Sequence, residues 1–365
     1  MRIEALVAEH VRNLLPLQLE PRERFNVFVG DNGQGKTNLL EAIFVVATLR
    51  SFRTSKLAEL VAFGSESAKL GARVLKDSLT RVYEVELAPH SRKVRLDGKA
   101  VRPVSRYFGE FNVVVFTPED LGLPRGAPGE RRRFLDRGVF NLEPSYLSTA
   151  SDYDKVLRTR NSVLRQAGEG RLAGKQVEEM LGVYDEQLAA LAVATIEARQ
   201  RFIVRILPAL SSAFAAITRT GLSAWMRYAS KLVGVSAEGI VQQLREGRAR
   251  DLGSGSTQIG PHRDDIVLEL DGREAGSFAS QGQLRAIMLA WKTAELVMLG
   301  EAHGDPPILL LDDVSSELDP DRNAFLFEHL ANLAGQCFIT TTSEGHVLLR
   351  RDRADYRIEA GRILQ

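Results

Sequence analysis

Cysteine is nearly absent from this chain of 365 residues, which contains only Cys337. A lone cysteine excludes an internal disulfide framework, and its apolar setting at residues 336–340 favours a buried thiol in a reducing compartment. Long hydrophobic runs are also scarce, because none approaches the roughly 18 apolar residues of a membrane span. The first residues predict a strand and lack the pattern of a secretory leader, so we expect a cytoplasmic protein without a membrane partner.

A strong net charge is absent as well, since 48 Lys and Arg residues are balanced by 47 Asp and Glu residues. Overall charge therefore gives no sign of nucleic-acid binding. The middle of the chain is mildly basic, with 20 Lys and Arg against 16 Asp and Glu in residues 119–254. Arginines are concentrated at Arg131, Arg132, Arg133 and Arg137, either as a solvated surface or as contacts for phosphates.

Short apolar runs separated by turn signals are found at both ends of the chain. Residues 25–29, 81–87, 94–96, 308–313 and 337–342 are predicted strands, and residues 36–50 are a predicted helix. Asp97 and Gly98, which follow the third of these strands, predict a hairpin turn. In the middle, residues 146–164 and 177–202 repeat apolar or small residues at helical spacing, which indicates a helical hairpin or arm. We therefore predict an α/β domain built from residues 1–118 and 255–365, with a mainly helical arm inserted at residues 119–254.

A complete phosphate-loop pattern, GDNGQGKT, lies between a predicted strand and a predicted helix. Glycines let several backbone N–H groups point at an anion, and the dipole of the following helix adds to that site. Lys36 is expected to reach the terminal phosphates of a nucleotide, and the hydroxyl of Thr37 is expected to bind Mg²⁺. The predicted binding residues are Gly30, Asp31, Asn32, Gly33, Gln34, Gly35, Lys36 and Thr37.

Two aspartates, Asp312 and Asp313, follow the apolar run at residues 308–311. If both predicted strands belong to one sheet, this pair lies beside the phosphate loop. We expect Asp312 to hold Mg²⁺ together with Thr37, and Asp313 to act with Lys36 as a catalytic residue that orients or deprotonates the attacking water. Without the phosphate loop, the pair would be interpreted as a strand end that meets solvent.

Ser280, Gln281, Gly282 and Gln283 precede a predicted helix and resemble the signature motif of ABC-type ATPases. Residues 315–319, with Ser316 and Asp319, resemble the D-loop of the same superfamily. This resemblance implies that the signature of one molecule contacts ATP on the phosphate loop of a second copy. It therefore implies an ATP-dependent, head-to-tail homodimer.

Within that superfamily, residues 116–136 and 257–265 and the spacing of all the motifs resemble the RecF family of bacterial recombinational repair proteins. The resemblance runs from end to end and implies that Arg12 and Asn13 contact the nucleotide. It also implies binding of double-stranded and gapped DNA, together with RecR and RecO, to help RecA replace single-strand-binding protein. Daughter-strand gap repair, replication restart and the SOS response are the implied processes.

Three positions depart from the wider ABC superfamily. Asp313 stands where a glutamate is usual, and the glutamine expected after residues 112–116 is missing, with Glu119 and Asp120 nearby. Threonine, most simply Thr341, replaces the switch histidine unless His346 takes that place. We therefore predict a weak, DNA-stimulated ATPase that serves as a timer.

The residues that contact DNA are less well defined by the sequence. Arg50 and Arg53 either bind DNA phosphates or cap the preceding helix, and Arg131, Arg132 and Arg133 are further candidates. Few aromatic residues lie near these arginines, which favours contact with the backbone of duplex DNA. The loop with His262 and Arg263 either senses nucleotide, braces the signature or forms a structural turn.

Three other functions compete with this interpretation. The nucleotide-binding subunit of an ABC transporter would lack an insertion of this length. A DNA tether of the SMC or Rad50 kind needs far longer heptad repeats than the insertion supplies. A scaffold that binds ATP and barely hydrolyses it fits the same motifs, and only measurement separates it from an ATPase.

Overall fold

The computed structural model describes residues 1–172, 174–333 and 335–364. The chain forms two compact units: unit 1 is Met1–Gly122, Ala209–Gly221 and Ser280–Gln365, and unit 2 is Leu123–Pro208 and Leu222–Ala279. The boundary between Gly122 and Leu123 lies near residue 118, where we expected the first domain segment to end. We expected residues 255–279 to belong to the ATPase domain, but they belong to unit 2. Strand pairing explains this difference, because Asp265–Leu270 pairs with Ala224–Ala229.

Unit 1 contains two six-stranded sheets. The first is antiparallel in the order β2-β1-β4-β5-β6-β7, and its strands are β1 (Arg2–Glu9), β2 (Leu17–Leu19), β4 (Ala68–Lys76), β5 (Leu79–Ala88), β6 (Ser91–Leu96) and β7 (Lys99–Ala100). Asp97 and Gly98 both have positive φ between β6 and β7, as a tight hairpin turn requires, which confirms the predicted turn.

The second sheet holds the predicted apolar strands. Its order is β15-β14-β3-β13-β12-β8, with all neighbours parallel except the antiparallel edge pair β14 and β15. The strands are β3 (Phe25–Val29), β8 (Val113–Phe116), β12 (Ile308–Asp312), β13 (Cys337–Thr341), β14 (Arg353–Glu359) and β15 (Arg362–Leu364). Continuous burial of β12 and β13 explains why their sequences are apolar without alternation. Cys337 is buried there, as predicted, and burial raises the pKa of its thiol.

Helix α1 (Lys36–Thr48) packs against strands of both sheets, and 11 of its 13 residues are buried. A helix that is apolar on all sides is expected in such a position. The other helices and helical turns of unit 1 are α2 (Pro118–Gly122), α9 (Gln281–His303), α10 (Pro320–Leu333), η1 (Leu57–Leu60), η2 (Val104–Tyr107), η4 (Val314–Glu317) and η5 (Glu344–His346). The mixed α/β class is thus confirmed.

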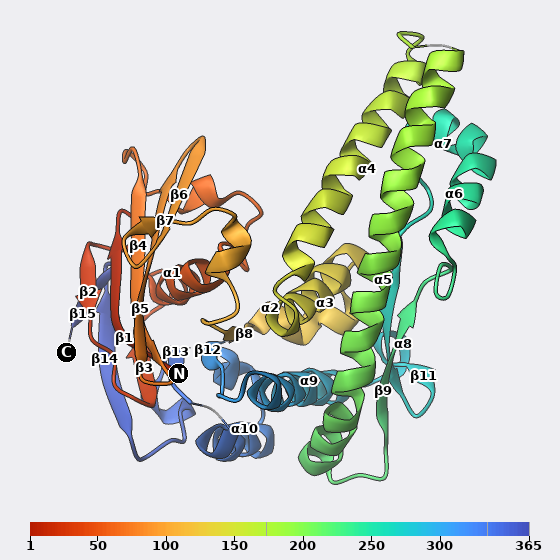
Figure 1. The fold of residues 1–365 in the computed structure, drawn as a ribbon. Helices are drawn as coiled ribbons and strands as arrows, with labels where there is room; N and C mark the ends of the chain where they lie inside the picture. Colours follow the sequence, from red (N-terminus) through yellow and green to blue (C-terminus); the bar gives the residue numbers. More distant parts are fainter. Residues whose placement is uncertain (173, 334, 365) are drawn as a thin grey trace. The chain divides into compact units, whose positions relative to one another are not determined.

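Unit 2 is mainly helical and contains the predicted hairpin (Figure 1). Its arm consists of α4 (Tyr146–Gly168) and of α5 (Lys175–Thr218) as far as Pro208, and the apolar side chains of the two helices share two buried clusters. The last part of α5 falls within Ala209–Gly221, which belongs to unit 1. Pro208 lies inside α5 where unit 2 ends, and proline cannot donate the backbone bond of a helix interior. The remaining elements are α3 (Pro128–Leu142), η3 (Leu123–Arg125), α6 (Ala237–Glu246), α7 (Arg248–Ser254), α8 (Ala275–Phe278) and the antiparallel sheet of β9 (Ala224–Ala229), β10 (Asp265–Leu270) and β11 (Arg273–Glu274).

A buried charge network ties the arm to α7. Arg160 of α4 is 0% exposed and donates to Asp185 Oδ1 at 2.8 Å and to Asp251 Oδ2 at 2.7 Å. Asp185 belongs to α5 and Asp251 to α7, so one guanidinium joins three helices. Such a network costs desolvation energy, and removing one partner would leave a buried charge unpaired.

By length and composition alone, helix α5 is long and apolar enough to cross a membrane, with a mean hydropathy of 1.4 in an 18-residue window. This differs from our expectation that no stretch approaches such a span. Only 33% of that window is buried, but a single helix of this kind is weak evidence for a membrane segment, because core helices of soluble proteins can pass the same test.

We expect Gly138→Ala to lower the free energy of unfolding by about 1–3 kcal/mol, because overpacking a core forces side chains to shift. A Cβ at this position of α3 would lie 2.4 Å from the Phe202 ring, which is 0% exposed. Urea denaturation followed by circular dichroism measures the change. Gly129→Ala is the control on the same helix, where the nearest atom would be at 3.7 Å. Equal losses in the two variants would contradict this account.

Candidate nucleotide site

The predicted phosphate loop lies between β3 and α1, as the sequence indicated. Gly33 and Gly35 have φ angles of 81° and 111°, which side chains other than glycine rarely adopt. At Gly30 a Cβ would lie 2.4 Å from the Ile358 carbonyl oxygen of β14. The first glycine of the loop is therefore required by close packing and the other two by backbone conformation.

Neighbouring segments hold the loop in place. The Asn13 side chain donates to the Gly33 carbonyl at 2.8 Å, and the Gly361 N–H donates to the Gln34 carbonyl at 2.9 Å. Lys36 Nζ bends back to the carbonyl oxygens of Gly30 at 2.6 Å and Asp31 at 2.9 Å. Burial lowers the pKa of Lys36, while the carboxylates of Asp313 and Asp312 oppose that shift.

The acidic pair lies at the carboxyl end of β12, directly beside this loop. Asp312 Oδ1 accepts the hydroxyls of Thr37 at 2.9 Å and Thr340 at 2.7 Å, so α1, β12 and β13 meet at one oxygen. Burial raises the pKa of Asp312, and the negative charge of Glu119 raises it further. The hydrogen bonds from the Thr340 and Thr37 hydroxyls lower the same pKa. The structure thus brings together Thr37 and Asp312, the two residues that we predicted to hold Mg²⁺.

Asp313 is strained and incompletely bonded. Its φ is 48°, and its buried Oδ1 has no hydrogen-bond partner among the described residues. Burial raises the pKa of this carboxyl group, and the positive charge of Lys36 opposes the shift. An orphaned carboxylate oxygen beside a phosphate loop fits a group that is held ready for a ligand or water.

Hard oxygen donors such as those of Thr37 and Asp312 are the ligands that Mg²⁺ prefers, usually together with nucleotide phosphates. The glycine loop, the ammonium of Lys36 and the α1 N-terminus suit the phosphates themselves. A hollow of 540 Å³ adjoins this loop and is lined in part by Gly30, Asp31, Gln34 and Thr342. The residues present therefore fit a nucleoside triphosphate with Mg²⁺.

Arg12, which the resemblance implied as a nucleotide contact, has other partners in the structure. Its guanidinium forms two bonds to Glu41 of α1, at 2.7 and 3.0 Å, and Glu41 is 0% exposed. Asn13 touches the phosphate loop through Gly33, so it lies in the expected place. The role of both residues in nucleotide contact stays a prediction.

The signature residues form the N-terminus of α9. Ser280 Oγ accepts the Gln283 N–H at 3.2 Å, and Gln283 Oε1 accepts the Ser280 N–H at 2.8 Å, which is a capping box. The other N–H groups of this first turn have no carbonyl partner within the helix, as at any helix start. In the D-loop, Ser316 Oγ donates to the Asp313 carbonyl at 2.7 Å. Asp319 forms an ion pair with Arg322 of α10.

Of the arginines predicted to bind DNA, several are engaged inside the chain. Arg131 forms a bidentate pair with Asp265, and Arg132 donates to the Asp264 carbonyl at 2.7 Å. Arg53 bonds to Asn38 at 2.7 Å and to Glu41 at 3.3 Å. Arg133 and Arg50 are exposed.

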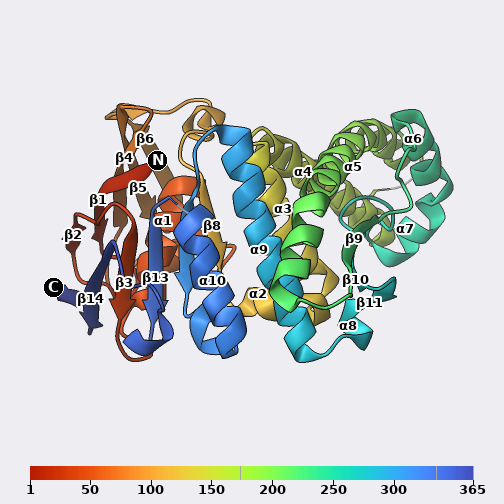
Figure 2. The same ribbon diagram turned by 90° about the horizontal axis from the view of Figure 1, so that it is seen from below.

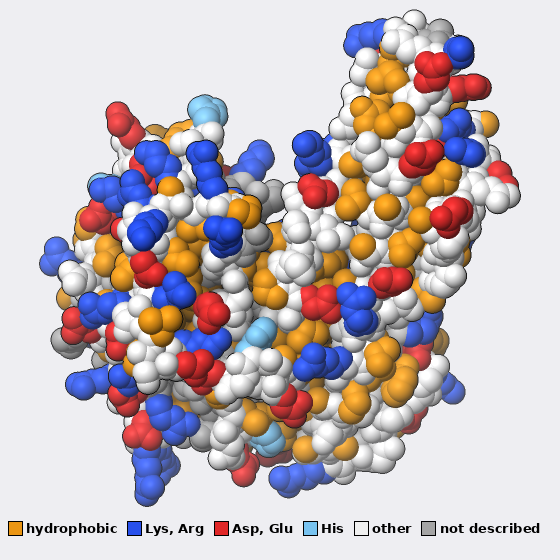
Figure 3. Space-filling view, in the orientation of Figure 1, with side chains coloured by type: hydrophobic (Ala, Val, Ile, Leu, Met, Phe, Trp, Pro, Cys, Tyr) orange, Lys and Arg blue, Asp and Glu red, His pale blue; other side chains and the backbone are white. Residues whose placement is uncertain are grey.

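The β6–β7 hairpin carries a further basic region, which the sequence alone did not indicate. Arg92 donates to the Leu49 carbonyl at 3.1 Å, so it caps α1 and lies near Arg50. Burial lowers the pKa of Arg92, and the positive charge of Arg50 adds to the shift. Lys93, Arg95 and Lys99 are exposed on the same hairpin, and Lys and Arg side chains gather over this part of unit 1 (Figure 3). The basic residues are visible in the sequence SRKVRLDGK, at residues 91–99. They alternate with apolar residues there, so the run was interpreted only as a strand.

The loop with His262 belongs to unit 2 and is held by contacts within that unit. Tyr153 Oη lies 2.7 Å from His262 Nδ1, and His262 Nε2 lies 2.9 Å from the Thr257 carbonyl. Burial lowers the pKa of His262 to about 4, so the imidazole is neutral near pH 7. These contacts favour the structural alternative among the three that the sequence left open.

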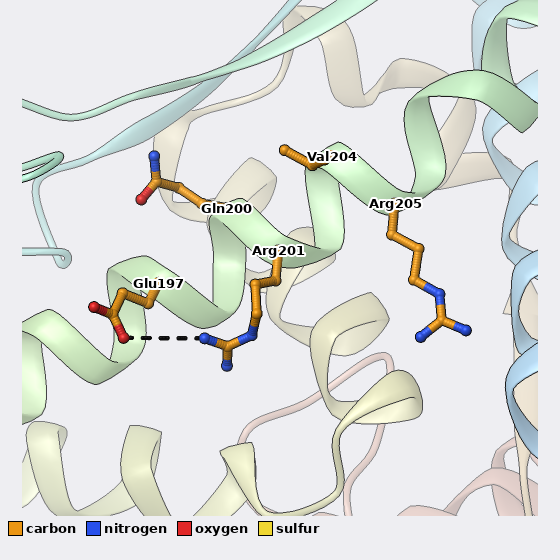
Figure 4. A pocket seen from close by; sticks show the side chains of 5 residues that line it. All are labelled: Glu197, Gln200, Arg201, Val204 and Arg205. Atoms are coloured by element: carbon orange, nitrogen blue, oxygen red, sulfur yellow. Dashed lines mark ion pairs between the residues drawn. The ribbon is translucent and has the colours of Figure 1, made fainter.

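A hollow of 420 Å³ on unit 2 is lined by side chains of α5 alone (Figure 4). Arg201 and Glu197 form an ion pair across one helical turn at 4.0 Å, and Val204 is 70% exposed. The exposed side chains of one helix do not make a converging set of polar groups. We assign no chemistry to this hollow.

A phosphate loop on a parallel sheet, an acidic strand end and a capped signature helix together define an ATPase of the ABC type. The sequence model described as the RecF/RecN/SMC N terminal domain matches residues 2–358. The chain belongs to the RecF family, because relatives along its whole length carry that name.

These relatives are bacterial proteins. The DNA replication and repair protein RecF of Geobacter sp. strain M21 is 40% identical over 100% of both chains, and that of Myxococcus xanthus is 41% identical over 94% of this chain and 91% of its own. A solved structure of the recombination mediator protein RecF with ATP, in the RecFOR pathway, has a TM-score of 0.88 at 30% identity, covering 99% of this chain and 96% of that one. An Smc head has a TM-score of 0.55 at 14% identity and covers 100% and 98% of the two chains, so it shares the fold.

We expect Asp313→Asn to raise the melting temperature of the nucleotide-free protein near pH 7. The pKa of Asp313 is raised in the folded chain, so ionisation costs stability as the pH rises through that pKa. The gain should disappear near the ordinary aspartate pKa of about 3.9, where wild type is also neutral. Melting curves across this pH range test the sign. Asp321→Asn, on an exposed position in the first turn of α10, should give no gain.

Proposed function

We propose that this protein is an ATP-dependent DNA-binding protein of recombinational repair, in which ATP with Mg²⁺ drives a head-to-tail homodimer. The observation that carries the proposal is the contact of Thr37 with Asp312 beside a preformed phosphate loop. The RecF relatives named as DNA replication and repair proteins, and the RecF structure with ATP, support the biological assignment. The capped N-terminus of α9 supports the dimer, because a helix start is an anion site.

The chain's own residues suggest how binding would proceed. Lys36 would exchange the carbonyls of Gly30 and Asp31 for phosphate oxygens, which carry a larger negative charge. Thr37 and Asp312 would hold Mg²⁺, which neutralises charge on the phosphates. Ser280 and the first N–H groups of α9 would contact the terminal phosphate on a second copy. Loss of that phosphate removes the contacts that favour the closed dimer, so hydrolysis releases the DNA.

Asp313 is the proposed residue that orients or deprotonates water. Its unpartnered Oδ1 and its raised pKa suit a proton acceptor. The side chains of Lys36 and His346 are near enough to affect the pKa of this carboxyl group. The proposal includes weak, DNA-stimulated hydrolysis that acts as a timer. Fast single-turnover hydrolysis without DNA would contradict the timer, whereas undetectable hydrolysis with DNA would favour an ATP-binding scaffold.

The proposed setting is the cytoplasm, at gapped or stalled DNA. There the protein would act with RecR and RecO to help RecA replace single-strand-binding protein. Daughter-strand gap repair, replication restart and the SOS response are the processes that would depend on it.

Ser280→Arg should abolish ATP-dependent dimerisation and leave the ATP affinity of the monomer within about twofold, because the arginine blocks only the partner's nucleotide. Lys36→Ala should instead weaken ATP binding itself, and Asp313→Asn should prolong the dimer. Sedimentation velocity with and without ATP, paired with fluorescent-nucleotide titration, measures both quantities. Ser151→Arg adds the same side chain to an exposed position of α4 and is the matched control. A wild-type protein that stays monomeric with ATP and duplex DNA would refute the dimer.

Arg50 and the β6–β7 hairpin form the proposed DNA surface. The side chains of Arg50 and Arg92 lie close enough to repel each other, and a phosphate between them would remove that cost. Phosphate contacts position a protein on DNA without reading the bases. We therefore expect binding that depends strongly on salt and little on sequence.

The double variant Arg95→Glu/Lys99→Glu should lower duplex affinity and reduce the slope of log affinity against log salt by about 2, since each phosphate contact contributes about 1. Fluorescence anisotropy at several salt concentrations, with two unrelated duplexes, measures this slope. The control Arg227→Glu/Lys231→Glu reverses two exposed charges on unit 2. The same loss in both double variants would remove the assignment of the surface.

A further inference from the structure

Helix α9 buries two charged side chains among its apolar residues. Lys292 is 5% exposed and Glu295 is 2% exposed, while neighbours such as Leu289 and Leu299 are 0% exposed. Charged side chains are almost never buried to this extent unless they have partners. The nucleotide site described above uses neither residue.

One partner of Lys292 on another element is Asp120 of α2. Lys292 Nζ lies 3.8 Å from Asp120 Oδ2 and 3.1 Å from Glu295 Oε2. Asp120 is itself 6% exposed, and its Oδ2 accepts the Thr117 N–H at 3.2 Å, so it also holds the start of α2. Helices α2 and α9 pack together in unit 1 (Figure 2).

The two helices joined by this pair lead to the two halves of the proposed ATP site. Helix α2 follows β8, which pairs with β12, and Glu119 of α2 acts electrostatically on Asp312. Helix α9 begins directly after Ser280. The Lys292–Asp120 pair therefore links the metal-binding edge to the helix that presents the signature.

Such a pair is poorly explained as a source of stability. A buried ion pair loses hydration on both sides, and apolar side chains of similar volume often give equal or greater stability. What a buried pair does supply is a preferred arrangement, because shifting one helix leaves a buried charge without its partner. This favours a role in positioning α9.

We propose that Lys292 is a positioning residue that couples the metal-binding edge to the signature helix, by pairing with Asp120 across α2 and α9. The inference rests on the proposed function, since it concerns how Ser280 is presented to a second copy. Lys292 is not among the residues proposed to bind nucleotide or Mg²⁺. Its loss should weaken dimerisation and leave nucleotide binding by the monomer nearly unchanged.

The test uses the full chain with Lys292→Met, Asp120→Asn and the double variant. Asparagine keeps an oxygen for the Thr117 N–H and removes only the charge. We expect each single variant to weaken ATP-dependent dimerisation about tenfold, within the range of couplings between sites, with ATP affinity of the monomer changed less than about twofold. The double variant should be no worse than Lys292→Met, because Lys292→Met already removes the ion pair that Asp120→Asn removes.

Thr293→Val is the matched control, because Thr293 is also buried on α9 and bonds only within the helix, to the Leu289 carbonyl at 2.9 Å. This control variant should dimerise like the wild type. Lys292→Arg keeps the positive charge, so it should dimerise more strongly than Lys292→Met. Sedimentation velocity, nucleotide titration and thermal melting are measured on every variant.

Wild-type dimerisation in Lys292→Met, additive losses in the double variant, or an equal loss in Thr293→Val would each overturn the inference while leaving the proposed function in place. A lower melting temperature with lost ATP binding would show a purely structural role and would also overturn it. A wild-type chain that stays monomeric with ATP would refute the proposed function and this inference together.

Discussion

The contact of Thr37 with Asp312 is the interaction on which the site depends. It joins the first turn of α1 to the end of β12, and Thr340 adds the end of β13 through the same carboxylate oxygen. Residues more than 270 positions apart in the chain are thereby held within 2.9 Å. Parallel pairing makes this possible, because the carboxyl ends of β12, β13 and β3 meet at one edge of the sheet.

Polar groups that are costly to bury recur where position matters. Asp313 keeps an unpartnered oxygen beside the phosphate loop, and Lys292 is buried between two carboxylates. Arg160 joins three helices of unit 2 in a similar way. Burying polar groups in this way is costly, and such departures from an apolar core are expected at functional sites.

Local patterns predicted a large part of the fold. The phosphate loop was predictable because its glycines, lysine and threonine act through neighbouring backbone, and β12 and β13 were predictable from short apolar runs. The Asp97-Gly98 turn and the helical hairpin likewise follow from local propensity. The assignment of residues 255–279 to unit 2 was not predictable, because it depends on the pairing of β10 with β9, a strand distant in the sequence.

The charged residues show most clearly where sequence reasoning ends. A row of arginines at 131–133 suggested phosphate contacts, but Arg131 is bound to Asp265, 134 positions away. The exposed cations of β6 and β7 became a surface only when the hairpin came to lie beside Arg50. Nothing local in the sequence pairs Lys292 with Asp120, since that requires α9 to pack on α2.

By itself, the sequence predicted the phosphate loop, the acidic strand end and the signature helix start, because those motifs reside in short runs of backbone and adjacent side chains. Only the tertiary structure decided which charges are paired, which are exposed and which strands share a sheet. The physical reason is that burial and long-range pairing depend on neighbours brought together by folding, and the electrostatic energy of a charge is set by those neighbours.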